Sequence, residues 1–503
     1  MRHIFSLPQC RALSAIVLTL SLDGCAVGPD YQPAAPPTGK AYESTALPLA
    51  TAQAASRDGA AQFFRVGEDL PDQWWTLYRA PALDRLIRQA LEANPDLKAA
   101  DAALRQGQEL AAAERGGLLP SLDASASQQR NRSSGAAQGQ PAFSSLYNVT
   151  SASLSVSYNV DVFGGTRRAI EASEAQSEYQ RWQREASILT LTANIVTAAI
   201  DEASLRAQID ATQRIIADQT DQLTAIRRQF AVGGASRADI LAQDSLLAQS
   251  KATLPSLEKQ LHQQRHLLAT YLGRSPADEI DAAFDLDALS LPVDLPVTLP
   301  ARLVQQRPDI LAAAANLHYA SAEVGVAVAN QWPQLILSAD YGTAAATAGQ
   351  LFTTGAAAWG LGASLAQPIF HGGALGHRRA AAEAAFDQAN AQYQSTVLTA
   401  LRNVADSLRA LQSDAETLQQ QQAYADAADR SMALTRQRYA LGAVSHVALL
   451  DAQRSEAQAR LALIAAQAAR LSDSAALFQA LGGGWWNRPD SAAPPPDLIG
   501  PLF

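Results

Sequence analysis

Residues 152–162 read ASLSVSYNVDV and lead, through Phe163-Gly164-Gly165, into roughly 65 residues that contain neither glycine nor proline. Apolar side chains at the even positions, from Ala152 to Val162, alternate with small polar ones at the odd positions. This period of two is typical of a β-strand with lipid on one face and water on the other. About 11 residues are enough to cross a bilayer at a tilt. The stretch therefore predicts a membrane-spanning strand that is followed by a very long helix.

The same order of features occurs twice, about 210 residues apart. In the first copy, the landmarks are Gly117-Leu118-Leu119-Pro120, the unbroken stretch Thr166 to Val232, and the turn Val232-Gly233-Gly234-Ala235-Ser236. In the second copy, they are Trp332-Pro333, Phe370-His371-Gly372-Gly373, the stretch His377 to Leu441, and the turn Leu441-Gly442-Ala443-Val444-Ser445. Such repeats pack against copies of themselves, because one unit cannot bury its own apolar face.

Each copy contains two strand patterns, which makes four in the chain. The other three place apolar residues opposite polar or small ones: Leu122, Ala124 and Ala126 against Asp123, Ser125 and Ser127; Leu335, Leu337, Ala339 and Tyr341 against Ser338 and Asp340; and Trp359, Leu361, Ala363 and Leu365 against Gly360, Gly362 and Ser364. We expect surface loops around Arg132 to Gln140 and Ala344 to Gln350. Four strands cannot close a barrel, and an open edge in hydrocarbon leaves backbone groups unsatisfied. We therefore expect three chains to contribute twelve strands; a soluble β-sandwich is the alternative, although sandwich strands do not lead into 65-residue helices.

Composition narrows the class of protein further. The formal net charge of −9 argues against a nucleic-acid partner. After the N-terminus we find no apolar run of 18 residues, so we expect no transmembrane helix, and any spanning must be by a barrel. The two cysteines, Cys10 and Cys25, form no CxxC motif and indicate neither a disulfide nor a metal site.

The N-terminus predicts a secreted lipoprotein. Arg2, His3 and Arg11 precede a short apolar core, which has the length of a signal peptide. Leu22-Asp23-Gly24-Cys25 resembles a lipobox, in which the cysteine is lipidated, although Asp23 departs from the pattern. Ala26 after the cysteine is typical of lipoproteins sent to the outer membrane. The alternative is a signal peptide that is cleaved nearby, with Cys25 incidental.

The long helices require neighbours. About 65 residues at 1.5 Å each extend roughly 100 Å, and a helix of that length is stable only if its apolar stripe is covered. We expect that stripe to include Ile188, Leu191, Ile195, Ala199 and Glu202, and later Leu398, Leu401, Val404 and Leu408. Pro255 should kink or break the first return helix. Pro120 and Pro333 mark the change from helix to strand.

Two turns of the type Gly-x-x-Ser join the long helices to their return helices. In each, glycine (Gly233, Gly442) permits the left-handed conformation that ends a helix, and serine (Ser236, Ser445) caps the next one. His262 and His266 have a spacing that can bind a metal, but no third ligand is nearby, so we expect a solvated helix face. We find no catalytic triad, phosphate loop or paired-carboxylate motif.

In order along the chain, these motifs resemble the outer membrane factors of Gram-negative efflux systems, the TolC-like family, and its NodT-type lipoprotein branch. The resemblance starts at Cys25-Ala26-Val27-Gly28-Pro29-Asp30-Tyr31 and ends near Trp485. Its other landmarks are Trp74-Trp75, Pro81-Ala82-Leu83, Asn94-Pro95-Asp96-Leu97, Arg307-Pro308-Asp309-Ile310, Phe163-Gly164-Gly165, Gln367-Pro368-Ile369-Phe370 and Leu449-Leu450-Asp451-Ala452-Gln453-Arg454. Each motif is weak alone, and their order and spacing carry the match.

The resemblance implies a mixed α and β membrane protein, a trimer with a twelve-stranded barrel above a periplasmic helical barrel. A belt of shorter helices, around Ala82 to Ala112, Ala301 to Ala329 and the C-terminal region, would surround the middle. It divides the chain into a signal peptide (1–24), a lipidated extended segment (25–80), two repeats (81–290 and 291–485) and a Pro-rich tail (486–503) that we expect to be disordered.

The resemblance also implies site residues and partners. The hairpin tips at Gly233, Ser236, Gly442 and Ser445 would contact a periplasmic adaptor. Asp451 would form a threefold ring at the pore aperture, with Val447 as an apolar constriction and Arg454 paired with an acid of a neighbouring chain; the alternative for Asp451 is a solvated surface position.

The implied function is a passive exit duct for small molecules, driven by an inner-membrane transporter, with no enzymatic activity and no cofactor beyond the lipid on Cys25. The alternatives are a duct for type I protein secretion and a non-conducting coiled-coil scaffold. The sequence does not identify the transported substrate.

Overall fold

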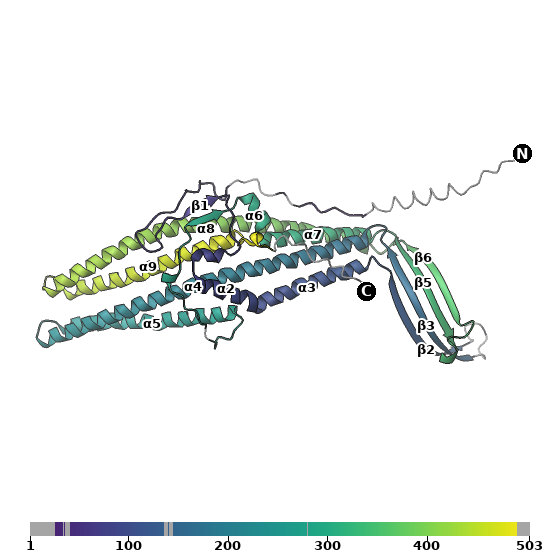
Figure 1. Ribbon diagram of the computed structural model, residues 1–503, viewed down its shortest axis with the longest axis horizontal. Coiled ribbons are helices and arrows are strands. Elements are labelled where there is room, and N and C mark those ends of the chain that lie inside the picture. Colours follow the sequence, from purple (N-terminus) through teal and green to yellow (C-terminus); the bar gives the residue numbers. More distant parts are fainter. Residues whose placement is uncertain are drawn as a thin grey trace.

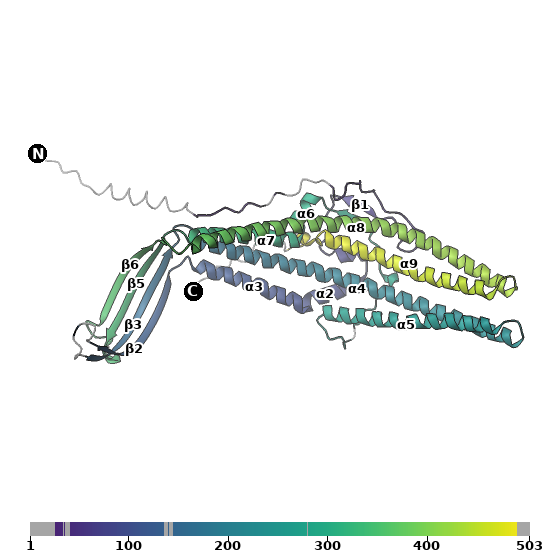
Figure 2. The same cartoon turned by 180° about the vertical axis from the view of Figure 1, so that it is seen from behind.

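The computed structural model describes residues 26–33, 35, 41–134, 139, 144–278 and 280–489. The expected signal peptide, Cys25 and the end of the C-terminal tail lie outside these residues. The molecule is elongated: a long bundle of helices forms one end, and a single sheet projects from the other end (Figures 1 and 2). The main hydrophobic core contains no residue of this sheet, so the helical part and the β part of the chain are spatially separate.

The sheet contains four antiparallel strands in the order β2-β3-β5-β6. They are β2 (Ser121–Ser134), β3 (Ser144–Val160), β5 (Gln334–Ala345) and β6 (Ala357–Ala366). The first pair is longer than the alternation predicted, because polar residues such as Gln128 and Asn131 continue the ladder into the expected loop. A short 3-10 helix, η4 (Ala348–Gln350), lies between β5 and β6. In a single chain β2 and β6 each have an edge without a partner strand.

The helices repeat in order and length. Repeat one contains α2 (Pro81–Ala93), α3 (Pro95–Gly116), α4 (Gly165–Ala231) and α5 (Arg237–Tyr271). Repeat two contains α6 (Pro300–Gln306), α7 (Pro308–Ala329), α8 (Ala374–Ala440) and α9 (His446–Ala480). The pairs α3/α7, α4/α8 and α5/α9 have 22, 67 and 35 residues in both copies. Pro120 and Pro333 lie just before β2 and β5, as expected.

Two details of the helices differ from the sequence expectations. α5 runs as one helix through Pro255, so the expected local break does not occur. α3 and α7 do not form a belt but run along the bundle beside the halves of α4 and α8 nearest the sheet (Figure 1). Along the expected stripe Ile195, Val404 and Leu408 are buried within the chain, whereas Ile188 and Leu401 are half-buried and Leu398 is 68% exposed in the single chain.

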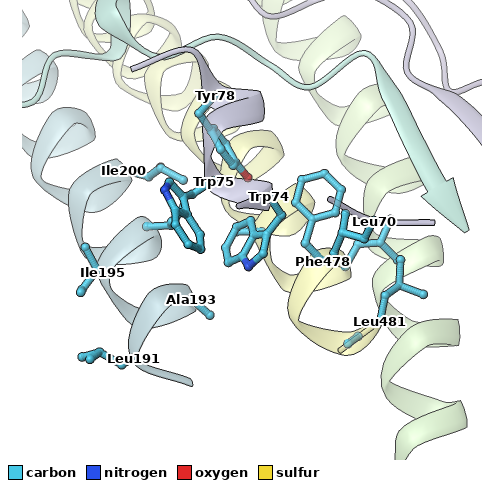
Figure 3. Close-up of a cluster of buried hydrophobic side chains, with 14 of the residues drawn as sticks. Leu70, Trp74, Trp75, Tyr78, Leu191, Ala193, Ile195, Ile200, Phe478 and Leu481 are labelled. Atoms are coloured by element: carbon cyan, nitrogen blue, oxygen red, sulfur yellow. The ribbon is translucent and has the colours of Figure 1, made fainter. Parts of the chain in front are cut away.

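In the main core, buried side chains of the N-terminal segment pack against the helices of both repeats (Figure 3). Trp74, Trp75 and Tyr78 belong to the 3-10 helix η1 (Trp74–Tyr78). The ring of Trp74 lies 5.6 Å from that of Phe478 on α9, and the Tyr78 hydroxyl donates to the Leu471 carbonyl at 2.8 Å. Burying each large apolar side chain stabilises the fold by roughly 1.5–3 kcal/mol. This core ties residues from both repeats to the N-terminal segment.

Small elements outside the long helices contribute residues to this core, among them Phe64, Leu286 and Leu295. β1 (Phe63–Val66) pairs in parallel with β4 (Asp294–Val297). The 3-10 helix η3 (Leu286–Ala288) precedes β4 in the chain, and the 3-10 helix η5 (Trp485–Asn487) follows α9. Because η5 includes Trp486, ordered structure continues into the segment that we assigned to the tail.

Two helices have stretches long and apolar enough to cross a membrane, by length and composition, which our search for apolar runs did not find. They are α4 and α9. Most of the apolar stretch of α4 is buried inside the chain, and helices in the core of a soluble protein have the same composition. The apolar stretch of α4 is therefore explained by packing inside the chain.

Candidate pore surface, helical tips and N-terminal contacts

The sheet has one apolar and one polar face because the register runs without a bulge across all four strands. In one row Ala124, Leu154, Tyr341 and Trp359 are aligned, and in the next row the aligned residues are Asp123, Ser155, Asp340 and Gly360. The strict alternation that each strand shows in sequence is therefore shared by all four strands. The chain provides a sheet with two chemically distinct surfaces.

The polar face is built from small side chains. The hydroxyls of Ser125 and Ser153 lie 2.8 Å apart, and those of Ser127 and Ser151 lie 2.9 Å apart. At Gly360 an added Cβ would lie 2.7 Å from an oxygen of Asp340, so the carboxylate fills the space that glycine leaves. A face of serine, glycine and two aspartates favours contact with water.

The apolar face is exposed in a single chain. Leu154, Tyr341, Trp359, Leu361 and Leu365 all have large exposed side chains. At the junction with the helices the rings of Phe163 and Trp332 stack with centroids 5.1 Å apart. Contiguous apolar surface of this kind marks contact with a membrane or another protein. Aromatic residues at one end of an apolar band are typical of a membrane interface.

Both helical tips are turns of the predicted type. Gly233 and Gly442 have φ of 79° and 70°, a left-handed conformation that suits glycine. The Ser236 hydroxyl accepts from the Asp239 amide at 3.1 Å, and the Ser445 hydroxyl accepts from the Ala448 amide at 3.4 Å. The capping roles inferred from sequence are confirmed by these contacts.

Each tip also presents one apolar side chain to solvent. Val232 and Leu441 directly precede the two glycines, and each has an exposed fraction of 84%. They occupy equivalent positions in the two repeats. Each tip thus exposes one apolar side chain, and both tips lie at the end of the bundle farthest from the sheet (Figure 1).

The two hairpins contact each other just above the tips. The Tyr439 hydroxyl donates to the Gln229 side-chain oxygen at 3.2 Å, which joins α8 to α4. His446, buried at the start of α9, lies with its Nδ1 3.5 Å from an Asp239 oxygen of α5 and with its ring 5.7 Å from that of Tyr439. Burial lowers the pKa of His446, and the Asp239 carboxylate partly opposes this shift. The sequence reading singled out neither Tyr439 nor His446.

The three predicted aperture residues lie on the first turns of α9. Asp451 and Val447 are both exposed in the single chain. Within the chain Arg454 donates to Asp451 at 3.2 Å. Asp451 is therefore part of an exposed ion pair, and Val447 is an exposed apolar side chain beside it.

The N-terminal segment is held at the junction between helices and sheet. The Val27 amide donates to the Phe163 carbonyl at 3.0 Å, and an added Cβ at Gly164 would lie 2.6 Å from the Ala26 Cα. Arg168 pairs with Asp30 at 2.7 Å, and its side chain fills the space left by Gly325. Cys25 lies outside the described residues. Its neighbour Ala26 lies beside Gly164, between the end of β3 and the start of α4.

A family model described as "Outer membrane efflux protein" matches residues 86–274 and 299–483. The chain belongs to the outer membrane efflux protein family. The two matched stretches correspond to the two runs of helix, strand pair and helical hairpin.

Named relatives agree with this assignment. The efflux protein is 33% identical over 418 residues to the pyoverdine export outer membrane protein OpmQ of Pseudomonas aeruginosa, which covers 82% of this chain and 87% of OpmQ. It is 31% identical over 493 residues to the toluene efflux pump outer membrane protein TtgF of Pseudomonas putida, covering 94% of this chain and 97% of TtgF. It is thus an outer membrane component of an efflux system.

Solved structures show the same fold. The outer-membrane channel OprN superposes with a TM-score of 0.81 at 27% identity, covering 92% of this chain and all of OprN. The open MtrE outer membrane channel of Neisseria gonorrhoeae superposes with a TM-score of 0.78 at 27% identity, covering 92% of this chain and 99% of MtrE. The efflux protein is therefore placed in the outer membrane, with its helices in the periplasm.

Contacts of the N-terminal segment explain part of the Gly-Pro-Asp-Tyr motif of this efflux protein. Tyr31 stacks on His318 of α7 with centroids 4.3 Å apart, and the His318 ring contacts Glu171 of α4 at 2.9 Å. Hydrogen bonds from Arg168 and His318 help to hold the pKa of Glu171 below its usual range, although burial alone would raise it. The sequence did not predict this cluster: Arg168 and Glu171 form an ordinary pair three residues apart on α4, and their other partners, Asp30 and His318, lie more than 100 positions away.

The possible metal pair of the efflux protein remains on a solvated face. His262 and His266 are exposed on α5, with ring centroids 6.4 Å apart. Among the described residues, no group of three or more His, Cys, Asp or Glu side chains is arranged to hold a metal ion.

Proposed function

We propose that three copies of this efflux protein join edge to edge into a twelve-stranded barrel and form a passive exit duct for small molecules. The observation that carries the proposal is the four-stranded sheet, whose outer strands β2 and β6 lack partners in one chain. In hydrocarbon each unsatisfied backbone group costs several kcal/mol, so these edges must pair. Pairing β6 of one copy with β2 of the next closes the sheet, and three copies give twelve strands.

The faces of the sheet set its orientation in such a barrel. The row with Leu154, Tyr341 and Trp359 faces lipid, and the row with Asp123 and Asp340 faces the lumen. Side chains as small as serine and glycine leave the lumen open. A barrel of this composition conducts water and solutes without any catalytic step.

The tips are the proposed contact with a periplasmic adaptor, which links the duct to an inner-membrane transporter. Val232 and Leu441, exposed beside Gly233 and Gly442, provide apolar points for that contact. Ser236 and Ser445 hold the turns in shape by capping the return helices. The tips are the part of the bundle farthest from the membrane, where a partner from the inner membrane arrives first.

The proposed aperture lies just above the tips. In a trimer Asp451 from each chain would approach the threefold axis, with Val447 one turn nearer the tip. A ring of three carboxylates attracts cations and repels anions at short range. Arg454 shares the charge of Asp451 in its own chain and would moderate this field.

Cys25 is the proposed site of lipid attachment. Ala26 and Val27 are held against Gly164 and Phe163, at the membrane-facing end of the helices. An acyl chain on the preceding residue would therefore enter the bilayer beside the barrel. Each buried CH₂ contributes about 0.8 kcal/mol, which adds a tether to a barrel already held by its apolar face.

The test is conductance of the purified full-length protein in planar bilayers, together with its mass in detergent. We expect a trimer that conducts, and Asp451→Ala should raise the conductance or reduce the preference for cations. Asp426→Ala, at an exposed acid of α8 away from the tips, is the matched control and should behave as the wild type. A detergent-soluble monomer that never conducts, in any variant, would overturn the proposal.

A further inference from the structure

The four charged side chains on the strands are sorted by face. Asp123 and Asp340 lie on the lumen face, and Arg130 and Arg132 lie on the outward face. The assignment is firm because every pair from Ser121↔Ser157 to Ser134↔Ser144 follows one unbroken register, so even positions of β2 share the face of Leu122. Both arginines are exposed. Cations therefore occur only on the outside of the proposed barrel, and only on β2.

The arginines lie beyond the apolar band. Tyr341 follows Trp332 by nine residues, which at about 3.3 Å per residue and a tilt of about 40° spans roughly 23 Å, the thickness of an apolar band. Arg130 lies six residues past Ala124, the position aligned with the row of Tyr341 and Trp359. That step adds about 15 Å along the membrane normal. The pair thus lies outside the hydrocarbon, on the side away from the helices (Figure 1).

No acid of this hairpin neutralises the arginines. From position 124 to position 160 the sequence contains no aspartate or glutamate. Within the part of the chain that the structure describes, the contact of Arg132 is a 3.5 Å hydrogen bond to the Ser144 hydroxyl, and neither arginine forms an ion pair. The second hairpin adds no acid, since residues 341–376 carry no charged side chain other than His371. The outer rim of the barrel has a net positive charge.

We propose that Arg130 and Arg132 bind the phosphate and carboxylate groups of lipopolysaccharide in the outer leaflet. The inference rests on the barrel proposed above, because only a barrel in the outer membrane brings this face to lipid. Lipopolysaccharide carries its phosphates at the edge of the hydrocarbon, and the acidic sugars of its inner core lie just beyond, at the height of this pair. Guanidinium groups bind both kinds of anion through two parallel hydrogen bonds.

The spacing of the pair suits a ligand with several anionic groups. Alternate residues on one strand face lie about 6.8 Å apart, so the two arginines can hold separate anions of one molecule. Three copies would place three such pairs around the barrel. The aspartates on the other face keep the lumen unattractive to the same ligand, so binding is confined to the outside.

The test titrates the purified full-length trimer, in a zwitterionic detergent, with the deep-rough lipopolysaccharide Kdo₂-lipid A, and counts bound molecules by native mass spectrometry. The double variant R130Q/R132Q should lose roughly ten-fold or more in apparent affinity. The variant R130K/R132K, which keeps the charge but not the paired geometry, should fall between the two. The control D123N/D340N changes two charges on the lumen face and should bind as the wild type.

Three results would overturn the inference. One is unchanged affinity in R130Q/R132Q; the second is equal loss in D123N/D340N. The third is equal competition by inorganic phosphate or by phosphatidylglycerol vesicles, which would make the pair an unspecific anion contact. Planar-bilayer conductance of the same preparations separates this inference from the proposed function: a conducting R130Q/R132Q trimer with unchanged affinity refutes only the lipid site. A wild-type protein that is neither trimeric nor conducting refutes both.

Discussion

The two return helices α5 and α9 have the same length and the same type of N-terminal cap, yet they have opposite surroundings. α5 has 35 residues, of which only Gln243, Leu246, Leu247, Leu268 and Ala269 are buried. α9 also has 35 residues, and fifteen of them are buried. The reason is topological: α9 packs on both α8 and α4, whereas α5 packs mainly on α4. Duplication preserved the dimensions of the hairpins but placed one return helix inside the chain and the other at its edge.

Equivalent leucines show the contrast directly. Leu241 of α5 and Leu450 of α9 occupy the same position relative to the capping serines Ser236 and Ser445. Leu241 is 60% exposed and Leu450 is 4% exposed. An exposed leucine on an edge helix is expected where another copy will cover it. α9 therefore belongs to the core of its own chain, and we expect the edge with α5 to meet a neighbouring copy.

The largest effect should come from Arg470, a buried residue of α9 that holds the N-terminal segment. Its guanidinium donates to the carbonyls of Asp58 and Ala60 and to the side chains of Thr51 and Gln62, at 2.7–3.2 Å. Arg470→Ala leaves these acceptors buried and unpaired, so we expect a loss of about 3–5 kcal/mol. Chemical unfolding in detergent measures it, together with protease sensitivity of residues 51–62.

Leu261 occupies the equivalent position of α5 and is only half-buried, which makes Leu261→Ala the matched control. We expect it to cost about 1 kcal/mol or less. Equal losses at Arg470 and Leu261 would contradict the view that the two return helices differ in surroundings.

The next largest effect separates folding from assembly. Leu450→Ala removes a buried side chain and should destabilise the single chain by about 2–4 kcal/mol. Leu241→Ala should leave the unfolding of the single chain almost unchanged but weaken the trimer, measured as a shift toward monomer on dilution in detergent. If Leu241→Ala leaves the trimer intact at every dilution, α5 is not at the interface between copies.

Most of this architecture could be predicted from sequence because it follows from periodicity. The alternation in residues 152–162 and the two helical stretches without glycine or proline fixed both strand and helix locations, and Gly233 and Gly442 fixed the turns. The ends of β2 and β3 were missed because Gln128 to Ser134 carry no apolar alternation. Their pairing depends on the partner strand, which local patterns do not contain.

The unpredicted parts of the site all depend on long-range contacts. Arg470 and Thr51 are 419 positions apart, and Tyr31 and Ala314 are 283 apart. Leu398 shows that helical spacing alone does not say whether an apolar residue is covered within one chain or between chains, because it is exposed in the single chain while Val404 and Leu408 of the same stripe are buried. His446 was missed because a histidine beside a capping serine has no distinctive pattern, although its burial joins the two hairpins.

A smaller effect should distinguish the two caps. Ser236 and Asp239 form a reciprocal capping box, in which the Asp239 carboxylate accepts from the Ser236 amide at 2.8 Å. Ser445 has only the longer bond to the Ala448 amide. We expect Ser236→Ala to cost about 1 kcal/mol and Ser445→Ala about 0.5 kcal/mol. Hydrogen exchange of the first turn of each return helix measures both, and a larger effect at Ser445 would reverse the comparison.

The smallest effect should be a pH dependence that only the second tip shows. Burial lowers the pKa of His446 below its unfolded value of about 6.5. The unfolded turn therefore binds the proton more readily than the folded turn does. The stability contributed by neutral His446 is present above about pH 6.5 and is lost as the pH falls from there toward the folded pKa. Asp239 stays ionised in this range, because its hydrogen bonds to Ser236 lower its pKa. The Asp239 carboxylate favours protonated His446 and so limits this loss of stability. We therefore expect the free energy of unfolding to change by less than about 1 kcal/mol.

Hydrogen exchange of the first turn of α9, corrected for the intrinsic rate, should therefore become faster between pH 7.5 and pH 5.5. His446→Asn removes the titrating group and should flatten this dependence. The first turn of α5, where Arg237 stands at the position equivalent to His446, should show no such dependence in either protein. Faster exchange at low pH in both return helices would mean that the whole bundle loosens in acid. In that case His446 would not distinguish the two tips, and α5 and α9 would differ only in how their side chains are packed.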